Sequence, residues 1–185
     1  FYFTSVKIIN KIPTNKTVLI SPLDWGLGHA TRCIPIIHAL LKQQNKVFVC
    51  ASDASRHLLE SEFPNLSIIP IPGYNIRYSR KPSGMMRSLL FQLPKIAYRA
   101  FREFRMVKKI ATLIQPDLII SDNRLGFRHT DIPSVYITHQ LSIETGNDWL
   151  NRMAQRCHYV YLNKFDECWV PDDEGRESLA GKLSH

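Results

Sequence analysis

The chain alternates short apolar runs with longer stretches in which apolar residues recur every three or four positions. The short runs are rich in β-branched side chains and predict six strands, at 16–21, 46–52, 66–72, 117–122, 134–140 and 167–171. The longer stretches predict helices at 31–44, 53–63, 85–114 and 148–162. Strands that are apolar throughout and alternate with helices are typical of a mainly parallel sheet covered on both faces. We therefore predict an α/β fold that is Rossmann-like and doubly wound.

Three polar loops follow predicted strands and should therefore lie at the same edge of the sheet. They follow the first, fourth and fifth strands and comprise residues 23–32, 122–131 and 138–148. In open parallel sheets, ligands bind beyond the carboxyl ends of the strands, where the strand order reverses. The convergence of these loops predicts a functional site at this edge.

The first of these loops, LDWGLGHATR, holds the candidate catalytic residue. Gly26 and Gly28 allow the backbone to turn sharply and approach a ligand, and the helix that follows would direct free N–H groups at an anion. His29 at this entrance has the chemistry of a general base. The alternative is a tight turn without a ligand. Asp24 and Trp25 favour function, because a turn needs neither of them.

The loops after the fourth and fifth strands add candidate ligand-binding side chains. Arg124 has the chemistry to bind a phosphate or carboxylate, and Asn123 to bind a sugar hydroxyl. In the alternative interpretation the loop is solvated and Asp122 accepts hydrogen bonds from backbone N–H groups. His139 follows the fifth strand at the same edge. Both interpretations stay open from the residues alone.

Two nucleotide-binding motifs fit the first loop poorly. The dinucleotide fingerprint requires glycine or alanine at the position held by Thr31, and an acidic residue at the end of the second strand, which Asp53 only approximates. No Gly-Lys-Ser/Thr follows, which excludes a P-loop. An NAD(P)-type oxidoreductase domain therefore stays an alternative, on a partial match.

The positive charge of the chain is concentrated in one block. The net charge is +8, and residues 77–109 contain ten basic residues and a single acidic one, Glu103. Apolar side chains such as Tyr98 and Phe101 are interspersed among them. Such a block suits the surface of an anionic membrane or a solvated helix face. No helix-turn-helix, zinc finger or RNP-type strand accompanies it, so we predict no nucleic-acid binding.

The cysteines and the termini indicate a cytoplasmic protein. None of the four cysteines forms a CxxC pair, so we expect reduced, mostly buried thiols and no zinc site. No apolar stretch approaches the roughly 18 to 20 residues needed to span a bilayer. The first residues lack the long apolar region of a secretory signal.

The motif D-W-G-x-G-H-x-x-R, at residues 24–32, is followed in order by QPDLIISDNRLGFR at 115–128 and ITHQL at 137–141. From residue 17 onwards these stretches resemble the N-terminal half of a GT-B glycosyltransferase of the family 28 type, which includes the MurG-like enzymes. They are most similar to a bacterial group of predicted glycosyltransferases with this first loop. MurG-like relatives have a more glycine-rich loop, from which Asp24 and Trp25 depart.

This resemblance implies two Rossmann-like domains that face each other across a cleft. The N-terminal domain would hold the acceptor, and the C-terminal domain would bind a nucleotide-sugar donor as co-substrate, with no metal and no further cofactor. Gly26 and Gly28 would face the donor diphosphate, and His29 would be the catalytic base. The acceptor-binding residues implied are Asp24, Trp25, Asn123, Arg124 and His139.

The resemblance also implies boundaries and partners. Residues 1–16 would be an N-terminal extension, 17–171 the acceptor-side domain and 172–185 the start of an interdomain linker. The donor-binding domain would follow, so we expect no sugar transfer by this chain alone. A glycan or glycolipid would supply the acceptor hydroxyl, at the inner face of the membrane, with contacts from Arg99, Arg102 and Arg105. A non-catalytic module that binds a membrane or an acidic partner is the remaining alternative.

Overall fold

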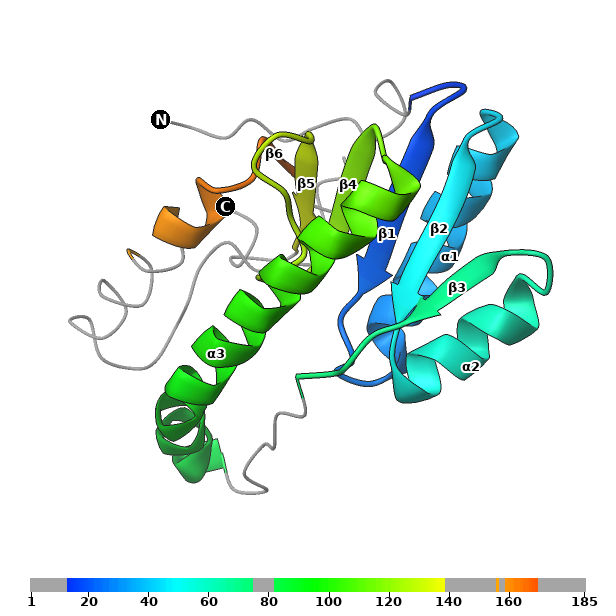
Figure 1. Cartoon of the computed structure of the whole chain (residues 1–185). Helices are drawn as coiled ribbons and strands as arrows, with labels where there is room; N and C mark the ends of the chain where they lie inside the picture. Colours follow the sequence, from blue (N-terminus) through cyan, green and yellow to red (C-terminus); the bar gives the residue numbers. More distant parts are fainter. Residues whose placement is uncertain (1–12, 75–81, 139–155, 157–158, 170–185) are drawn as a thin grey trace, which may run out of the picture.

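The computed structural model describes residues 13–74, 82–138, 156 and 159–169. Strands and helices alternate from the first strand to the fourth, and two further strands follow (Figure 1). In order they are β1 (Thr17–Pro22), α1 (Leu27–Lys42), β2 (Lys46–Ala51), α2 (Asp53–Glu62), β3 (Ser67–Pro70), α3 (Pro82–Ile114), β4 (Leu118–Asp122), β5 (Ser134–Ile137) and β6 (Glu167–Trp169). Residues 159–162, the end of the predicted helix 148–162, are helical. The rest of that helix lies mostly outside the described residues.

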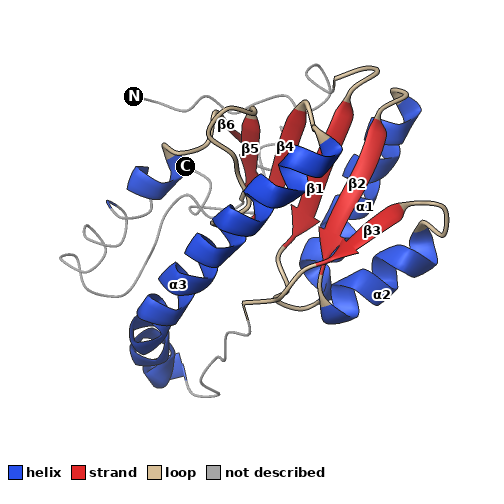
Figure 2. Ribbon diagram, viewed as in Figure 1, coloured by secondary structure: helices blue, strands red, loops and turns tan. Residues whose placement is uncertain are grey.

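The six strands form one parallel sheet in the order β3-β2-β1-β4-β5-β6 (Figure 2). Val18 of β1 pairs with Val47 on one side and with Leu118 on the other. The order therefore reverses between β1 and β4, and their carboxyl ends form the switch point at which such sheets bind ligands. The predicted Rossmann-like fold is confirmed.

Both faces of the sheet are covered, which explains why its strands are apolar at every position. Val18 and Ile20 of β1 belong to a core shared with α1 and α2, whereas Leu19 between them belongs to a core shared with α3. Successive side chains of a strand point to opposite faces. A strand between two helical layers must therefore be apolar on both faces, and this removes the alternation seen in half-exposed sheets.

Helix α1 begins four residues earlier than the apolar pattern predicts. Gly26 precedes it with φ 75° and ψ −179°, a conformation open essentially only to glycine, so the chain reverses at this residue. Gly28 and His29 consequently lie in the first turn of the helix and not in a loop before it. Low helix propensity at Gly28 obscures this start in the sequence.

Cys33, Cys50 and Cys168 are buried, as expected, and form no disulfide within the described residues. Cys157 lies outside the described residues. In the described part of the chain, no helix combines the length and apolar character needed to cross a membrane.

The loop after β4 packs closely against α3, and glycine is required for this contact. A Cβ atom on Gly126 would lie 2.1 Å from the backbone oxygen of Ala100. We expect Gly126→Ala to lower the free energy of unfolding by at least ~2 kcal/mol, because the two backbones would have to separate. Urea unfolding of the purified chain measures this.

Gly28→Ala is the matched control, because a Cβ atom there meets nothing within 4 Å. It should leave stability unchanged or raise it slightly, since alanine is the better helix former. Equal stability of the two variants would contradict the close approach of this loop to α3.

Candidate functional site

His29 and Asp122 meet at the switch point of the sheet. Asp122 ends β4 and is fully buried, and His29 lies in the first turn of α1 with its side chain 13% exposed. The distance between His29 Nδ1 and Asp122 Oδ2 is 3.0 Å. An ionised carboxylate only accepts hydrogen bonds, so Nδ1 donates to Asp122 in the tautomer that carries the ring proton on Nδ1. Nε2 then carries the lone pair, and none of the described residues forms a hydrogen bond with it.

The sequence identified His29 but did not identify Asp122 as its partner. From the sequence, Asp122 is expected only to accept hydrogen bonds from backbone N–H groups in a loop. The two residues are 93 positions apart, and they meet because β1 and β4 are neighbours in the sheet. The sequence does contain a signal for Asp122, because it is a carboxylate at the last position of an apolar strand. This signal points to a partner on α1 only once β1 and β4 are known to be neighbours.

The amino-terminal end of α1 adds a second chemical feature to the same place. Its first turn contains no acidic residue, and no side chain caps it by a hydrogen bond. The first N–H groups of a helix have no partners within the helix and carry a partial positive charge. The space beside Gly26 and Gly28 is open at the positions a Cβ atom would take. An anionic group can therefore approach the backbone here.

Arg124 is buried beneath the site and has protein partners on all three guanidinium nitrogens. Nε donates to Oε1 of Glu103 on α3 at 2.5 Å, Nη2 to the oxygen of Pro72 at 2.9 Å and Nη1 to that of Pro22 at 3.3 Å. Its side chain is 1% exposed. This burial argues against the acceptor-binding role predicted for Arg124. The residue instead ties α3 to the end of β1 and to the segment that follows β3.

Asp24 is also held within the protein. Its Oδ1 accepts a hydrogen bond from the backbone N–H of Tyr74 at 3.0 Å, and its side chain is 7% exposed. The hydroxyl of Tyr74 donates to Oε2 of Glu103 at 2.6 Å. Burial, together with the nearby Glu103 carboxylate, raises the pKa of Tyr74. Asp24 is therefore part of the framework behind the loop, and its predicted contact with an acceptor gains no support from this geometry.

Two other predicted acceptor residues remain partly exposed at this edge. Asn123 has a left-handed backbone (φ 58°), and its Oδ1 accepts a hydrogen bond from the hydroxyl of Tyr136 at 3.0 Å. Trp25 packs against a small cluster that includes Leu23. His139 lies outside the described residues. Within the described structure, His29, Trp25 and Asn123 are thus the predicted catalytic and acceptor-binding residues whose side chains a ligand can reach.

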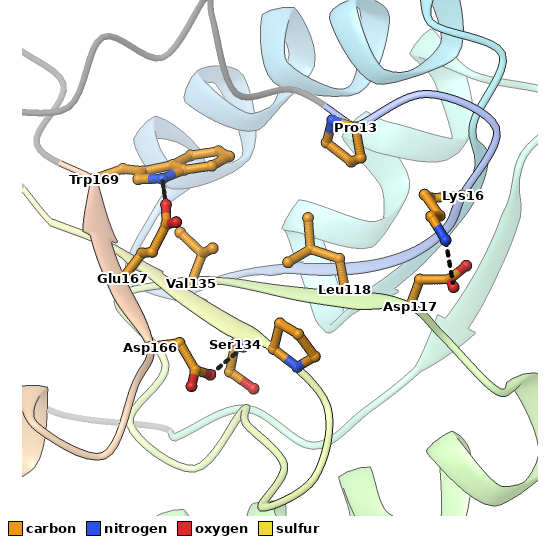
Figure 3. Close-up of a pocket in the computed structure, with 10 residues that line it drawn as sticks. Pro13, Lys16, Asp117, Leu118, Ser134, Val135, Asp166, Glu167 and Trp169 are labelled. Atoms are coloured by element: carbon orange, nitrogen blue, oxygen red, sulfur yellow. Dashed lines mark hydrogen bonds and ion pairs between the residues drawn. The ribbon is translucent and has the colours of Figure 1, made fainter.

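A cavity of about 280 Å³ lies elsewhere, at the amino-terminal edge of the sheet (Figure 3). Its carboxylates already have partners: Asp117 pairs with Lys16, and Asp166 and Glu167 accept from the Ser134 backbone and the Trp169 indole. The cavity is therefore separate from His29. Throughout the described ranges, no group of three His, Cys, Asp or Glu side chains is placed to hold a metal.

Residues 21–154 match the model of the family described as glycosyl transferase family 1. The chain belongs to this family. The match includes the loop with His29, helix α3 and the end of β4 with Asp122, so the residues of the site lie within the family domain. The predicted glycosyltransferase character is confirmed at this level. The closer resemblance to MurG-like enzymes stays a prediction.

Solved structures share the fold of this glycosyl transferase family 1 domain. The glycosyltransferase SsfS6 of Streptomyces sp. SF2575 has a TM-score of 0.53 at 15% identity, over 86% of this chain and 49% of that one. The glycotransferase of kitacinnamycin has a TM-score of 0.54 at 15% identity, over 80% of this chain and 36% of that one. A UDP-N-acetylglucosamine 2-epimerase has a TM-score of 0.51 at 12% identity, over 85% of this chain and 40% of that one. The chain thus spans less than half of each structure. The curated proteins contain no match.

The buried Arg124–Glu103 pair should be essential to the stability of this glycosyl transferase family 1 domain. We expect Glu103→Gln to lower the free energy of unfolding by about 3 kcal/mol, because the buried guanidinium loses its close carboxylate and keeps the more distant Asp24, 3.9 Å from Nη1. Denaturant unfolding followed by circular dichroism measures the loss.

Glu60→Gln provides the comparison, since Glu60 pairs with Arg56 on the surface of α2. Exposed pairs contribute little, so its cost should stay below about 1 kcal/mol. Similar losses for the two glutamine variants would show that Glu103 does not carry the role described.

Proposed function

We propose that this chain is the acceptor-side half of a glycosyltransferase, with His29 as the catalytic base. The observation that carries the proposal is the contact between His29 Nδ1 and the buried carboxylate of Asp122 at the switch point. A carboxylate behind an imidazole fixes its tautomer and ring orientation, as in the hydrolytic triads. The family match supports sugar transfer in general.

In the proposed reaction Nε2 of His29 accepts the proton of an acceptor hydroxyl. The hydroxyl oxygen forms a bond to the anomeric carbon of a nucleotide sugar. The bond between that carbon and the diphosphate oxygen breaks, and its electron pair leaves with the nucleoside diphosphate. Asp122 stays ionised and stabilises the imidazolium that forms.

The start of α1 suits the leaving diphosphate. Gly26 sets the backbone conformation, and Gly28 leaves the first turn open to a bulky anion. Uncapped N–H groups and the positive end of the helix dipole stabilise negative charge that develops there. We assign the remaining contacts of the donor to a second domain, because the chain spans less than half of the similar solved structures, and for that reason expect no transfer by this chain alone.

The acceptor is proposed to be a hydroxyl of a glycan or glycolipid. Trp25, four residues before His29 in the chain, and Asn123, next to Asp122, are partly exposed and would contact it. An NAD(P)-dependent oxidoreductase is disfavoured by Thr31 in the first loop and by the glycosyl transferase match. The MurG-like resemblance favours a lipid-linked acceptor.

The proposal is tested by His29→Ala and Asp122→Asn in the full-length gene product. Loss of a general base should lower kcat by about 10²–10⁴-fold. Asp122→Asn should also lower kcat strongly, because an amide no longer fixes the Nδ1–H tautomer. Release of nucleoside diphosphate from a panel of nucleotide sugars and acceptors measures turnover.

His57→Ala is the control, because the side chain of His57 lies on α2 and is 82% exposed. It should retain full activity. Normal turnover by a folded His29→Ala protein would remove His29 as the base. Absence of turnover by the wild-type full-length protein across the whole panel would favour a non-catalytic binding module.

A second function, docking to an anionic membrane, is favoured by the exposed face of α3. Tyr98 and Phe101 are each 58% exposed, and the Arg102 guanidinium lies 5.9 Å from the ring of Tyr98. Arg105 is exposed on the same helix, and Arg99 is partly buried. Exposed aromatic rings beside cationic side chains suit the interface of an anionic bilayer.

Replacing Arg99, Arg102 and Arg105 with glutamate should release the full-length protein from vesicles rich in anionic lipid. Each lysine or arginine near such a surface contributes about 1 kcal/mol, and the substitution reverses three charges. Co-sedimentation with vesicles at low salt measures the bound fraction.

The matched control replaces Lys42, Lys46 and Lys164, which are exposed on other elements, with glutamate. It changes the net charge equally and should leave most of the binding intact. Equal loss in both variants would indicate attraction by net charge alone, and undiminished binding of the arginine variant would rule out docking through α3.

A further inference from the structure

A second side chain of α1 reaches the carboxylate that orients His29. The guanidinium of Arg32 donates through Nη2 to Oδ1 of Asp122, while His29 Nδ1 contacts Oδ2. The thiol of Cys33 lies 3.8 Å from the same Oδ2. These α1 residues are spaced i, i+3 and i+4, so they lie on one face of the helix. One buried carboxylate is thus shared by three groups of a single helix.

The charges at this site balance without a charge on His29. Asp122 is fully buried, and an ionised carboxylate in such a position needs an opposite charge. Burial holds the pKa of the Cys33 thiol well above its usual value. Burial, with Asp122 next in effect, also raises the pKa of Tyr136 on β5, so both groups are neutral. Among the described residues, Arg32 is the permanent cation that pairs with Asp122.

The geometry allows two hydrogen-bond arrangements, because Arg32 Nη2 also lies 2.9 Å from His29 Nδ1. In one, Nδ1 carries the proton and donates to Asp122. In the other, Nδ1 accepts from Arg32 and the proton is on Nε2. The second arrangement directs a lone pair at a carboxylate oxygen 3.0 Å away, and two acceptors repel each other. The first brings two donors together, since Nδ1–H then faces Arg32 Nη2 at 2.9 Å, so each arrangement contains one unfavourable contact. We adopt the first, which leaves the lone pair of Nε2 for a substrate hydroxyl.

We propose that Arg32 is a positioning residue that neutralises the buried charge of Asp122 and thereby keeps His29 an uncharged imidazole with its proton on Nδ1. The importance of this for catalysis rests on the proposed function, in which His29 is the base. Without Arg32, a protonated His29 is the remaining counter-ion in contact with Asp122 in the described structure. A protonated imidazole has no lone pair and accepts no proton from an acceptor.

The first test follows the imidazole nitrogens of His29 by two-bond ¹H–¹⁵N correlation NMR of the 185-residue chain at neutral pH. The signal is assigned by its loss in His29→Ala. We expect a protonated Nδ1 and an unprotonated Nε2 in the wild type, and nitrogen shifts close to those of imidazolium in Arg32→Gln. Arg32→Lys keeps the positive charge and should keep the neutral form. Arg56→Gln, which removes an arginine of α2, should leave the spectrum of His29 unchanged.

Two results would overturn the proposal. One is a neutral Nδ1–H form that persists in a folded Arg32→Gln protein, because Arg32 would then not be needed for it. The other is an Nε2–H tautomer in the wild type, which decides the question even where Arg32→Gln does not fold.

The second test is kinetic and uses the full-length gene product. Arg32→Gln should lower kcat at least about tenfold with little change in KM, since the general base contributes about 10²–10⁴-fold. In a His29→Ala background the same substitution should cost nothing further, because it acts through His29. Independent, additive losses would contradict the proposal. Full turnover by His29→Ala alongside the expected NMR response would reject the base role while supporting the control of His29 by Arg32.

Discussion

A carboxylate without access to water at the end of β4 is the constraint on which the candidate site depends. Asp122 is fully buried, so its charge must be balanced and its oxygens must accept hydrogen bonds from neighbouring groups. Those groups all come from the first two turns of α1. These side chains reach Asp122 because α1 begins directly after Gly26. This early start places His29 over the end of β4. A later helix start would move His29 away from Asp122.

A second buried charge lies two residues further along the chain and anchors the opposite layer of the fold. Asp122 contacts α1, whereas Arg124 contacts Glu103 on α3. Asn123 between them has a left-handed backbone, which turns the chain as β4 ends. One short segment therefore fastens a helix on each face of the sheet. The positions of α1 and α3 relative to the site depend on the same three residues.

The parts of this structure that follow from local pattern were predictable, and the parts that follow from strand order were not. Strand ranges came from apolar runs, because both faces of the sheet are buried, and His29 came from its place beside two glycines. Arg124 has the chemistry of a ligand-binding residue, and nothing in the sequence shows that Glu103, 21 positions earlier, lies against it. Likewise, nothing in the sequence shows that Asp122 contacts His29, which lies 93 positions earlier.

The same buried pair accounts for the charge of the outer face of α3. Between residues 77 and 109 the sequence contains one acidic residue, Glu103, and its side chain points inward to Arg124 and Tyr74. The pair removes the one negative charge from the surface of this block, while Arg102 and Arg105 stay exposed. Because Glu103 neutralises an arginine beneath the site, the charged side chains left on the exposed side of the helix are all positive. The stability of the domain and the charge of its proposed docking face have a common origin.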